Sequence, residues 1–445
     1  MKTRSITEVL DAEYAEYGMY TIEQRAIPSA VDGFKPTQRK AAFAATDVWK
    51  RGDEKPLKVF QLTGRMAAQC AYHHGDASAN STIVGMAQSF KNSLPIFEEI
   101  GQFGSLRAPE AGAPRYISTR LTPNFRLLYK DDRLLERKIE DGQQIEPRFF
   151  LPVVPAVLLN GSSGIAVGFA TNILNREPRA LTQACIAALE GKRMKEPLPW
   201  WRDFSGTVEQ IAPGQFSMRG TWEREDSTTV RVTELPPSMT FARYEAHLDS
   251  LVEKGHIARY EDSSSARPDY TVKFTRAGLQ SLIDSGGMDK LLRLTEQETE
   301  NITCLDENGR LREFDSAGEL IKWFVGFRLG YYGKRRDLML GDLTERSLLL
   351  SNRARFITMI LEGKLVVQKR QRKDLETELQ FLKFDQKDGG YSYLLSMPIH
   401  SLTRETYDQL MAELAEVQAE EKRVRALKPV EMYREDLDLL LKSLK

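Results

Sequence analysis

The chain has 445 residues, 41% of them hydrophobic, and its 63 Lys and Arg residues equal its 63 Asp and Glu residues in number. This length predicts two or three domains, and the zero net charge gives no argument for a nucleic-acid partner. No apolar run approaches the roughly 20 residues of a membrane span, and the three cysteines lack metal-type or disulfide-type spacing, so we expect a cytoplasmic protein without a membrane partner.

The first predicted helix covers residues 6–26 and ends before Pro28, which cannot continue it. A turn with Gly and Pro follows, and a second helix is predicted over 37–45. Cations gather at its beginning: Lys35, Arg39 and Lys40. Because positive charge opposes the helix dipole at that end, the grouping makes sense if these side chains meet phosphates.

Two more helices are predicted over 57–71 and 76–90, separated by a short turn at 72–75 and followed by an irregular stretch from 91 to 119. This pattern indicates a winged helix-turn-helix. On the last helix, three hydroxyl residues would face DNA and three apolar residues would enter the core: Ser78, Ser81 and Thr82 for the first group, and Ile83, Val84 and Met86 for the second.

The turn between these helices reads Tyr72-His73-His74-Gly75-Asp76. Asp76 can cap the following helix, and a helix N-terminus beside two imidazoles favours a phosphate. Adjacent side chains in a turn point apart, which argues against a metal site. We therefore expect no metal ligands in this chain.

Farther on, Ala113-Pro114-Arg115-Tyr116-Ile117 follows a loop rich in Gly, Ala and Pro. It carries a phenol beside a cation on irregular backbone. Such a pair suits attack on a phosphodiester. These strings resemble type IIA DNA topoisomerases, the family that includes the A chain of gyrase and eukaryotic topoisomerase II. By its length, and because no ATPase or metal-binding module is attached, the chain most resembles the separately encoded medium subunits of T-even bacteriophage topoisomerases. If it is encoded by a phage, we expect it in the host cytoplasm.

The resemblance implies that Tyr116 forms a bond to the 5′ end of cleaved DNA and that Arg115 stabilises charge on the phosphoryl group. Two copies would make a transient double-strand break, let a second duplex pass and rejoin the ends, which gives relaxation and decatenation. The predicted DNA-binding set is Arg25, Lys35, Arg39, Lys40, His73, His74, Ser78, Arg120 and Ile165.

Ile165 lies in the glycine-rich run Asn160–Gly168, after a strongly apolar segment. Glycines let backbone approach a partner closely, and the resemblance implies that Ile165 wedges between base pairs to bend the duplex. In the alternative interpretation, this glycine-rich run forms a strand and a tight turn that fill a domain interface. From about 203 to 314, short alternating strands with interspersed helices predict a mixed α+β domain, which corresponds to the family's tower.

The remainder is predicted to be helical. A proline-free stretch from 334 to 384 would extend roughly 75 Å as one helix, and a returning segment over 407–424 would pair with it as an antiparallel coiled coil. An apolar segment between them predicts a dimer contact at the distal tip. Its residues are Tyr391, Tyr393, Leu394, Leu395 and Met397.

The predicted fold is multidomain α+β: an N-terminal helical arm (1–27), a winged-helix cleavage domain (28–150), a tower (151–316) and a coiled-coil dimerisation domain (317–445). No phosphate-binding Gly-rich loop is found, and Asp436-Leu437-Asp438 has the spacing of a metal site but is typical of a solvated surface. We therefore expect an ATPase and Toprim partner, in one chain or two, to supply ATP hydrolysis and Mg²⁺.

Two other functions stay open from the residues alone. The chain could be a non-enzymatic dimeric architectural protein that bends DNA with Ile165, or a nuclease that uses His73, His74 and Asp76. Neither needs the Arg115-Tyr116 pair, which favours the topoisomerase.

Overall fold

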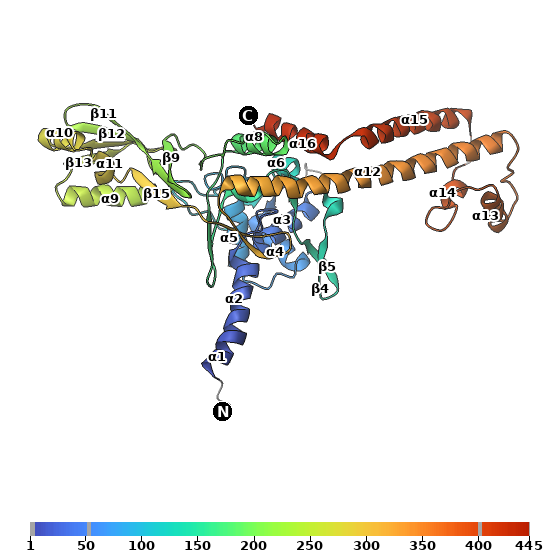
Figure 1. The fold of residues 1–445 in the computed structure, drawn as a ribbon, viewed down its shortest axis with the longest axis horizontal. Helices are drawn as coiled ribbons and strands as arrows, with labels where there is room; N and C mark the ends of the chain where they lie inside the picture. The colour runs from blue at the N-terminus through green and yellow to red at the C-terminus, as the bar shows by residue number, and fades with distance from the viewer. Residues whose placement is uncertain (1–4, 51–54, 399–402, 445) are drawn as a thin grey trace. The chain divides into compact units, whose positions relative to one another are not determined.

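The computed structural model describes residues 5–50, 55–398 and 403–444. It divides into two compact units, the first made of residues 1–328 and 434–445 and the second of residues 329–433 (Figure 1). Within the described ranges, none of the helices combines the length and the apolar character that crossing a membrane requires.

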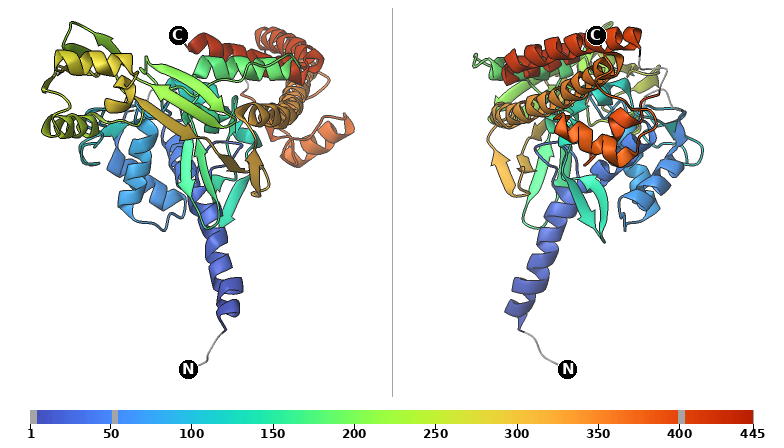
Figure 2. Two further views of the ribbon diagram at one scale, coloured as in Figure 1. Left: turned by 60° about the vertical axis from the view of Figure 1, so that its left-hand side comes forward. Right: turned by 90° about the vertical axis from the view of Figure 1, so that its right-hand side faces the viewer.

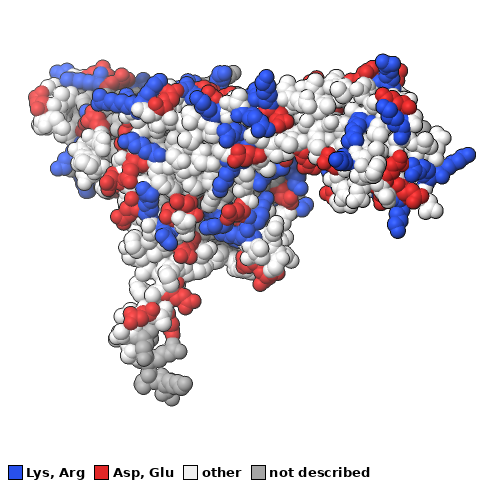
Figure 3. Space-filling view, turned by 45° about the vertical axis from the view of Figure 1, so that its right-hand side comes forward, with Lys and Arg blue, Asp and Glu red and all other residues white. Residues whose placement is uncertain are grey.

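The N-terminal arm is helical as predicted. It is built from α1 (Ile6–Val9), a π-helix (Leu10–Tyr14), α2 (Ala15–Thr21) and a second π-helix (Ile22–Ala26), and the helix stops before Pro28. Acidic side chains lie along it (Figure 3). Near its end the arm packs onto the body of the first unit, since Gly18, Thr21 and Ala26 are buried.

Three helices form the centre of the first unit: α3 (Pro36–Val48), α4 (Val59–Gln69) and α5 (Asp76–Ala87). A short antiparallel ladder joins β1 (Leu57–Lys58) to β2 (Ser118–Thr119). Figure 2 shows these helices clustered at the base of the arm. The three predicted helices are confirmed, although α5 ends at Ala87 instead of residue 90.

On α5, four side chains have the burial or exposure that the sequence predicted. Ile83 and Met86 are buried, whereas Ser78 and Ser81 are exposed. The predicted cap is wrong: Gly75, with extended backbone, is the N-cap residue, and Asp76 is the first helical residue. The Asp76 carboxylate therefore lies in the first turn, where negative charge still favours the helix dipole.

Short elements connect this centre to the next domain. They are α6 (Pro123–Leu128), β3 (Tyr129–Lys130), a 3-10 turn (Asp132–Leu134), β4 (Arg137–Glu140), β5 (Gln143–Pro147), β6 (Leu151–Pro152), α7 (Ala156–Asn160), β7 (Ser162–Ile165), β8 (Ala170–Ile173) and α8 (Pro178–Leu189). The pairs β3–β6, β4–β5 and β7–β8 are antiparallel. The apolar run from 151 to 159 is buried throughout.

The segment predicted as α+β has that character. One antiparallel sheet has the order β15-β10-β9 and another the order β11-β12-β14-β13. Its strands are β9 (Thr207–Ala212), β10 (Gln215–Arg219), β11 (Thr221–Arg224), β12 (Thr229–Glu234), β13 (Arg259–Asp262), β14 (Tyr270–Lys273), β15 (Thr295–Thr299), β16 (Ile302–Leu305) and β17 (Leu311–Phe314). Its helices are α9 (Phe241–Glu253), α10 (Arg276–Asp284) and α11 (Met288–Leu291). Residues from β12, β14 and α9 share one apolar core, including Val232, Tyr244 and Val272.

The long helix α12 runs from Ala317 to Leu361, 45 residues. The predicted helix from 334 to 384 is therefore wrong at both ends. Gly363 has a φ of +68°, in the left-handed region, and its N–H donates to the Ile360 carbonyl at 3.0 Å. A left-handed glycine just past the last turn is a common way for a helix to end.

The rest of the second unit folds back along this helix. It contains α13 (Arg372–Phe381), α14 (Ser392–Leu395) and α15 (Arg404–Ala426), and α16 (Pro429–Ser443) is the last helix. Apolar residues pack α12 against α15: Leu343 and Leu350 from the first, and Leu410, Leu414 and Val417 from the second. Arg346 and Glu413 add an ion pair of 2.5 Å between the two helices.

Candidate active site

Tyr116 lies in a turn after the loop at 101–112, and its side chain is 73% exposed. The Tyr116 N–H donates to the Ala113 carbonyl at 2.8 Å. From the other side, the Lys58 ammonium donates to the Tyr116 carbonyl at 2.8 Å. Hydrogen bonds to its backbone N–H and carbonyl thus hold Tyr116 in place while its phenol faces solvent.

The same turn is tied to the start of α4. The Val59 N–H donates to the Ile117 carbonyl and the Phe60 N–H to the Pro114 carbonyl, each at 3.2 Å. The first turn of a helix has N–H groups without partners inside the helix, and here two of them bind the turn. The nucleophile candidate is therefore positioned by regular structure although its own backbone is irregular.

Arg115 stands beside Tyr116, with its guanidinium carbon 5.8 Å from the phenol ring centroid. Both side chains are exposed. A phosphoryl group at the hydroxyl would thus find a cation close to it in a site open to a large substrate. This arrangement supports the role predicted for the pair.

The two histidines separate, as expected for neighbours in a turn. His73 points to the β4–β5 hairpin, where its Nε2 lies 3.4 Å from a Glu140 carboxylate oxygen. His74 Nε2 lies 3.4 Å from the Tyr20 hydroxyl, and its ring packs edge-on against the buried Tyr72 ring at 5.4 Å. The two imidazoles therefore have different surroundings.

An open hollow of about 580 Å³ brings His74 together with the arm and with α3 and α5. It is lined by Tyr20, Gln24, Arg25, Lys35, Thr37, Gln38, His74, Ser78, Ser81, Thr82 and Gly85. Among these described residues none is Asp or Glu, while two are cations. The hollow is suited to an anionic ligand.

Lys35 lies on the wall of this hollow. Its ammonium donates to the Ser163 carbonyl at 2.6 Å, and burial lowers the pKa of the Lys35 ammonium. Because burial has already removed part of the water around the Lys35 ammonium, binding a phosphate there costs less further desolvation. This favours a direct contact with an anion.

Two other cations of the predicted DNA-binding set are bound within the protein. Arg39 is 5% exposed and forms a bidentate pair with Asp32, at 2.6 and 3.0 Å. Lys40 bonds the Cys70 carbonyl and the Glu146 carboxylate, the latter at 3.0 Å. Pairing with the buried carboxylates of Asp32 and Glu146 therefore gives these two cations at the start of α3 a structural role within the protein.

Arg120 is likewise paired, with its Nε 2.7 Å from Glu98, and this hydrogen bond raises the pKa of the Arg120 guanidinium. The guanidinium is partly exposed. An exposed pair of this kind stabilises the fold little. The DNA contacts expected of Arg39, Lys40 and Arg120 stay predictions, although each of these cations already has a carboxylate partner.

Ile165 ends β7 and is 89% exposed, an unusual position for so large an apolar side chain. The Ile165 side chain itself fills no interface within the described part of the chain, although the strand of the alternative interpretation is present. The hairpin is seated on the arm: a Cβ added at Gly164 would lie 2.2 Å from the Ala26 carbonyl oxygen. Only glycine allows this approach.

At the tip of the second unit, the predicted dimer-contact residues divide. Tyr391 and Leu394 are 4% and 1% exposed and belong to a core with Phe356 and Leu379, so these two are core residues and not surface contacts. Tyr393, Leu395 and Met397 are partly buried against that core. Leu395 and Met397 also line an apolar hollow of about 350 Å³.

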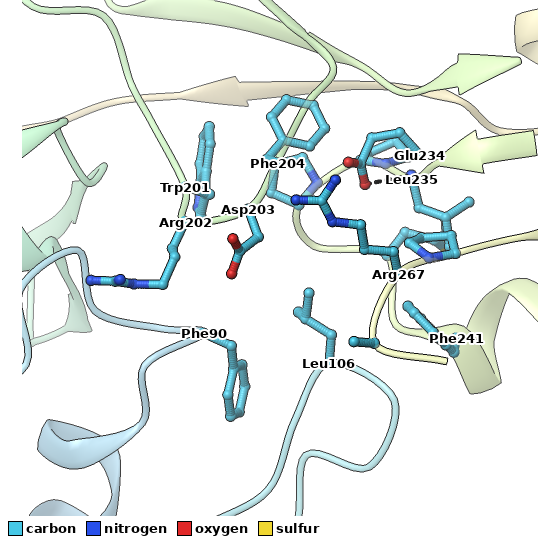
Figure 4. A pocket seen from close by; sticks show the side chains of 15 residues that line it. Phe90, Leu106, Trp201, Arg202, Asp203, Phe204, Glu234, Leu235, Phe241 and Arg267 are labelled. Carbon is cyan, nitrogen blue, oxygen red and sulfur yellow. Dashed lines mark hydrogen bonds between the residues drawn. The ribbon is translucent and has the colours of Figure 1, made fainter. Parts of the chain in front are cut away.

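A second hollow in the first unit lies among Phe90, Leu106, Trp201 and Phe204 (Figure 4). It holds only about 50 Å³, far below the roughly 300 Å³ at which ligand pockets begin. It is a packing gap, and we assign it no ligand.

No metal site is found among the described residues, since no group of three or more His, Cys, Asp and Glu residues comes together there. Asp436 is 2.6 Å from the Lys130 ammonium, and Asp438 is 3.0 Å from Arg434. Both carboxylates are therefore used in ion pairs.

Two residues of the site, Tyr20 and Lys58, do not follow from sequence reasoning. Each meets its partner across more than fifty positions of sequence, and no local pattern marks such a contact. The one available signal for Tyr20 is the row of tyrosines at three-residue spacing along the arm, Tyr14, Tyr17 and Tyr20. For Lys58 the sequence offers no comparable signal.

The chain is similar to known proteins in sequence and in fold. A family model described as the A chain of DNA gyrase/topoisomerase IV matches residues 25–438. The DNA topoisomerase medium subunit of Enterobacteria phage T4 is 33% identical over 442 residues, which cover 98% of this chain and 99% of that protein. DNA topoisomerase 2-alpha of Gallus gallus is 32% identical over 461 residues, covering 95% of this chain but 30% of that protein.

Among solved structures, the DNA-binding, cleavage and re-ligation domain of Plasmodium falciparum topoisomerase II matches with a TM-score of 0.87 at 30% identity. The match covers 98% of this chain and 64% of that one. The chain thus spans nearly the whole phage protein but less than two thirds of each of the two eukaryotic chains.

Proposed function

The chain belongs to the family of DNA gyrase and topoisomerase IV A chains, and from this membership we propose which of its residues carry out the reaction. It is a DNA-cleaving and rejoining subunit of a type II DNA topoisomerase. The observation that carries the assignment of residues is the exposed Tyr116 with Arg115 beside it, on a turn anchored to α4.

In the proposed reaction, the Tyr116 hydroxyl attacks the phosphorus of a DNA phosphodiester. A bond forms between the phenol oxygen and phosphorus, and the bond from phosphorus to the 3′ oxygen breaks. The phenol gives up its proton, and the leaving 3′ oxygen takes one up. Arg115 stabilises the negative charge that develops on the phosphoryl oxygens. The reverse attack by the 3′ hydroxyl reseals the strand without ATP.

DNA binding is proposed for the hollow and the residues next to it. Arg25, Lys35, His74 and Ser78 line the hollow, and backbone phosphates are the anions that this set fits. His73 lies on the other side of the same turn. Ile165, exposed at the end of its hairpin, is proposed to enter the base stack and bend the duplex.

We also propose the finer assignment of the fold. Helices α3 to α5 with β1 and β2 make the winged-helix domain, in which α5 is the recognition helix. The sheets between Thr207 and Phe314 make the tower, and α12 with α15 makes the coiled coil. The four domain ranges, 1–27, 28–150, 151–316 and 317–445, remain a prediction.

Type II topoisomerases use Mg²⁺ and ATP. We propose that a partner chain, or two, supplies the Toprim domain and the ATPase, in keeping with the absence of a cluster of three or more His, Cys, Asp and Glu residues among the described residues. We further propose that two copies of this chain act together, so that two Tyr116 residues cut the two strands of a duplex, and that the complete enzyme relaxes and decatenates DNA.

The test is Tyr116→Phe, which removes only the nucleophilic hydroxyl. In the enzyme reconstituted with its partner, denaturation should trap a covalent protein–DNA adduct with the wild-type chain and none with the variant. Duplex binding should change less than about twofold, because many phosphate contacts remain. Residual adduct in the variant would refute the assignment, and an absence of adduct in both would favour the architectural DNA-bending protein.

A further inference from the structure

Tyr20 is placed by the packed end of the arm. The neighbouring Gly18 and Thr21 are buried, and the Gly18 backbone lies against Val167 of the β7–β8 turn. Tyr20 itself is 43% exposed and lines the hollow. Its hydroxyl therefore faces the same space as the proposed phosphate-binding side chains.

Among the described residues, the Tyr20 hydroxyl has His74 Nε2 as its partner in that space, at 3.4 Å. The His74 ring also packs edge-on against the ring of Tyr72, which is 8% exposed, with the ring centroids 5.4 Å apart. His74 thus contacts both a core tyrosine and an arm tyrosine. When Nε2 carries the proton and donates to the Tyr20 oxygen, the phenol O–H is left to donate elsewhere.

The charged groups around this pair favour an anion as the acceptor. Arg25 comes from the arm and Lys35 from the start of α3, while α5 contributes the neutral hydroxyls of Ser78, Ser81 and Thr82. No described lining residue carries a carboxylate. A phosphate in the hollow would meet two cations and the hydroxyls of Ser78 and Ser81, whereas the Thr82 O–H already donates to the Ser78 carbonyl at 2.9 Å.

We propose that Tyr20 is a DNA-contacting residue: it accepts a hydrogen bond from His74 Nε2 and donates its own O–H to a backbone phosphate in the hollow. The inference rests on the proposed function, since it names a further contact in the same site. It makes the N-terminal arm part of the DNA-binding surface through a neutral donor as well as through Arg25.

The experiment measures equilibrium binding of the full chain to a short duplex of fixed sequence by fluorescence anisotropy, over a series of salt concentrations. Every protein carries Tyr116→Phe, so no covalent complex forms. Tyr20→Phe removes the hydroxyl and keeps the ring. The matched control is Tyr17→Phe, on the same arm, 53% exposed and not among the residues lining the hollow.

Tyr20→Phe should weaken binding about 10-fold, as expected for a hydrogen bond to a charged acceptor, and Tyr17→Phe should not weaken it. The slope of log affinity against log salt should stay unchanged in Tyr20→Phe, because a neutral donor releases no counterion, whereas Arg25→Ala should reduce it by about 1. In the absence of DNA, the ¹⁵N resonance of His74 Nε2 should shift in Tyr20→Phe and not in Tyr17→Phe.

Equal affinities of Tyr20→Phe and Tyr17→Phe would overturn the proposal. So would a changed salt slope in Tyr20→Phe, since it would show that the cations had moved. These results concern binding alone and leave the cleavage assignment untouched. Failure of adduct formation by wild-type Tyr116, in contrast, would overturn the proposed function without altering the binding comparison.

Discussion

At the scale of single residues, the sequence identified the exposed chemistry better than it identified the buried pairs. Arg115 and Tyr116 stand together on exposed backbone, as their spacing suggested. Arg39 and Lys35 looked equivalent, since both lie at the start of the same helix, yet Arg39 is buried on Asp32 and Lys35 faces the hollow. The difference depends on how the turn before α3 folds back, which a local pattern does not encode.

This difference gives a prediction about stability. Arg39→Met should lower the free energy of unfolding by about 3 kcal/mol or more, because it leaves the buried Asp32 carboxylate without its counterion. Arg25→Met, at an exposed position on the arm, should leave stability nearly unchanged and weaken duplex binding instead. Chemical denaturation measures the stability of both variants, and fluorescence anisotropy measures their affinity for the duplex. Unchanged stability in Arg39→Met would show that Asp32 is compensated otherwise.

At the scale of elements, helix positions were predictable because apolar periodicity and prolines mark them. The arm, α3, α4 and α5 all lie where expected. The end of α12 was not predictable in the same way, because Gly363 alone marks it and no proline follows before Pro398. The position of the β7–β8 hairpin against the arm was not predictable either, since it depends on contact between distant segments.

The contact of this hairpin with the arm gives the second prediction. Gly164→Ala should destabilise the chain by roughly 1–3 kcal/mol, because the new methyl group collides with the Ala26 carbonyl and the backbone must shift. Gly64→Ala, in the interior of α4 with open space around it, should instead be neutral or stabilising by up to about 1 kcal/mol.

Thermal unfolding of both variants measures the change in stability. Duplex bending by the Gly164→Ala variant is measured separately, by energy transfer between labels on the two ends of the DNA. We expect reduced bending, since Ile165 follows the displaced residue. A Gly164→Ala variant that is as stable as the wild type would contradict the tight packing of the hairpin on the arm.

At the scale of the whole molecule, the proposed site combines residues from the arm, α3, β1, the turn before α5, α5 itself and the loop before β2. The resemblance identified most of these segments at once, whereas composition, with its zero net charge, gave no indication of a DNA-binding protein. The structure divides into two compact units, and the four domain ranges expected from the sequence stay a prediction.

The apolar tip of the second unit leads to a prediction about assembly. The chain should be a dimer in solution, and Val366→Lys should shift it toward monomer, because Val366 lines the apolar hollow and is 57% exposed. Leu348→Lys is the control: it places the same charge at a 44% exposed position on α12, outside the tip core.

Sedimentation equilibrium distinguishes the two variants. A dimer that survives Val366→Lys, or one that Leu348→Lys dissociates equally well, would place the contact elsewhere on the chain.

The way the Tyr116 turn is fastened has a mechanical consequence. In the proposed covalent intermediate, a broken DNA end would hang from this side chain, and any tension on that end would pass into the turn. From there the load would be shared by the bonds to Lys58, Val59 and Phe60 and by the β1–β2 ladder. Because these bonds carry the load at the same time, together they resist more force than they would if they were loaded and broken one after another. The turn would thus serve as a tether that keeps two cut ends from separating.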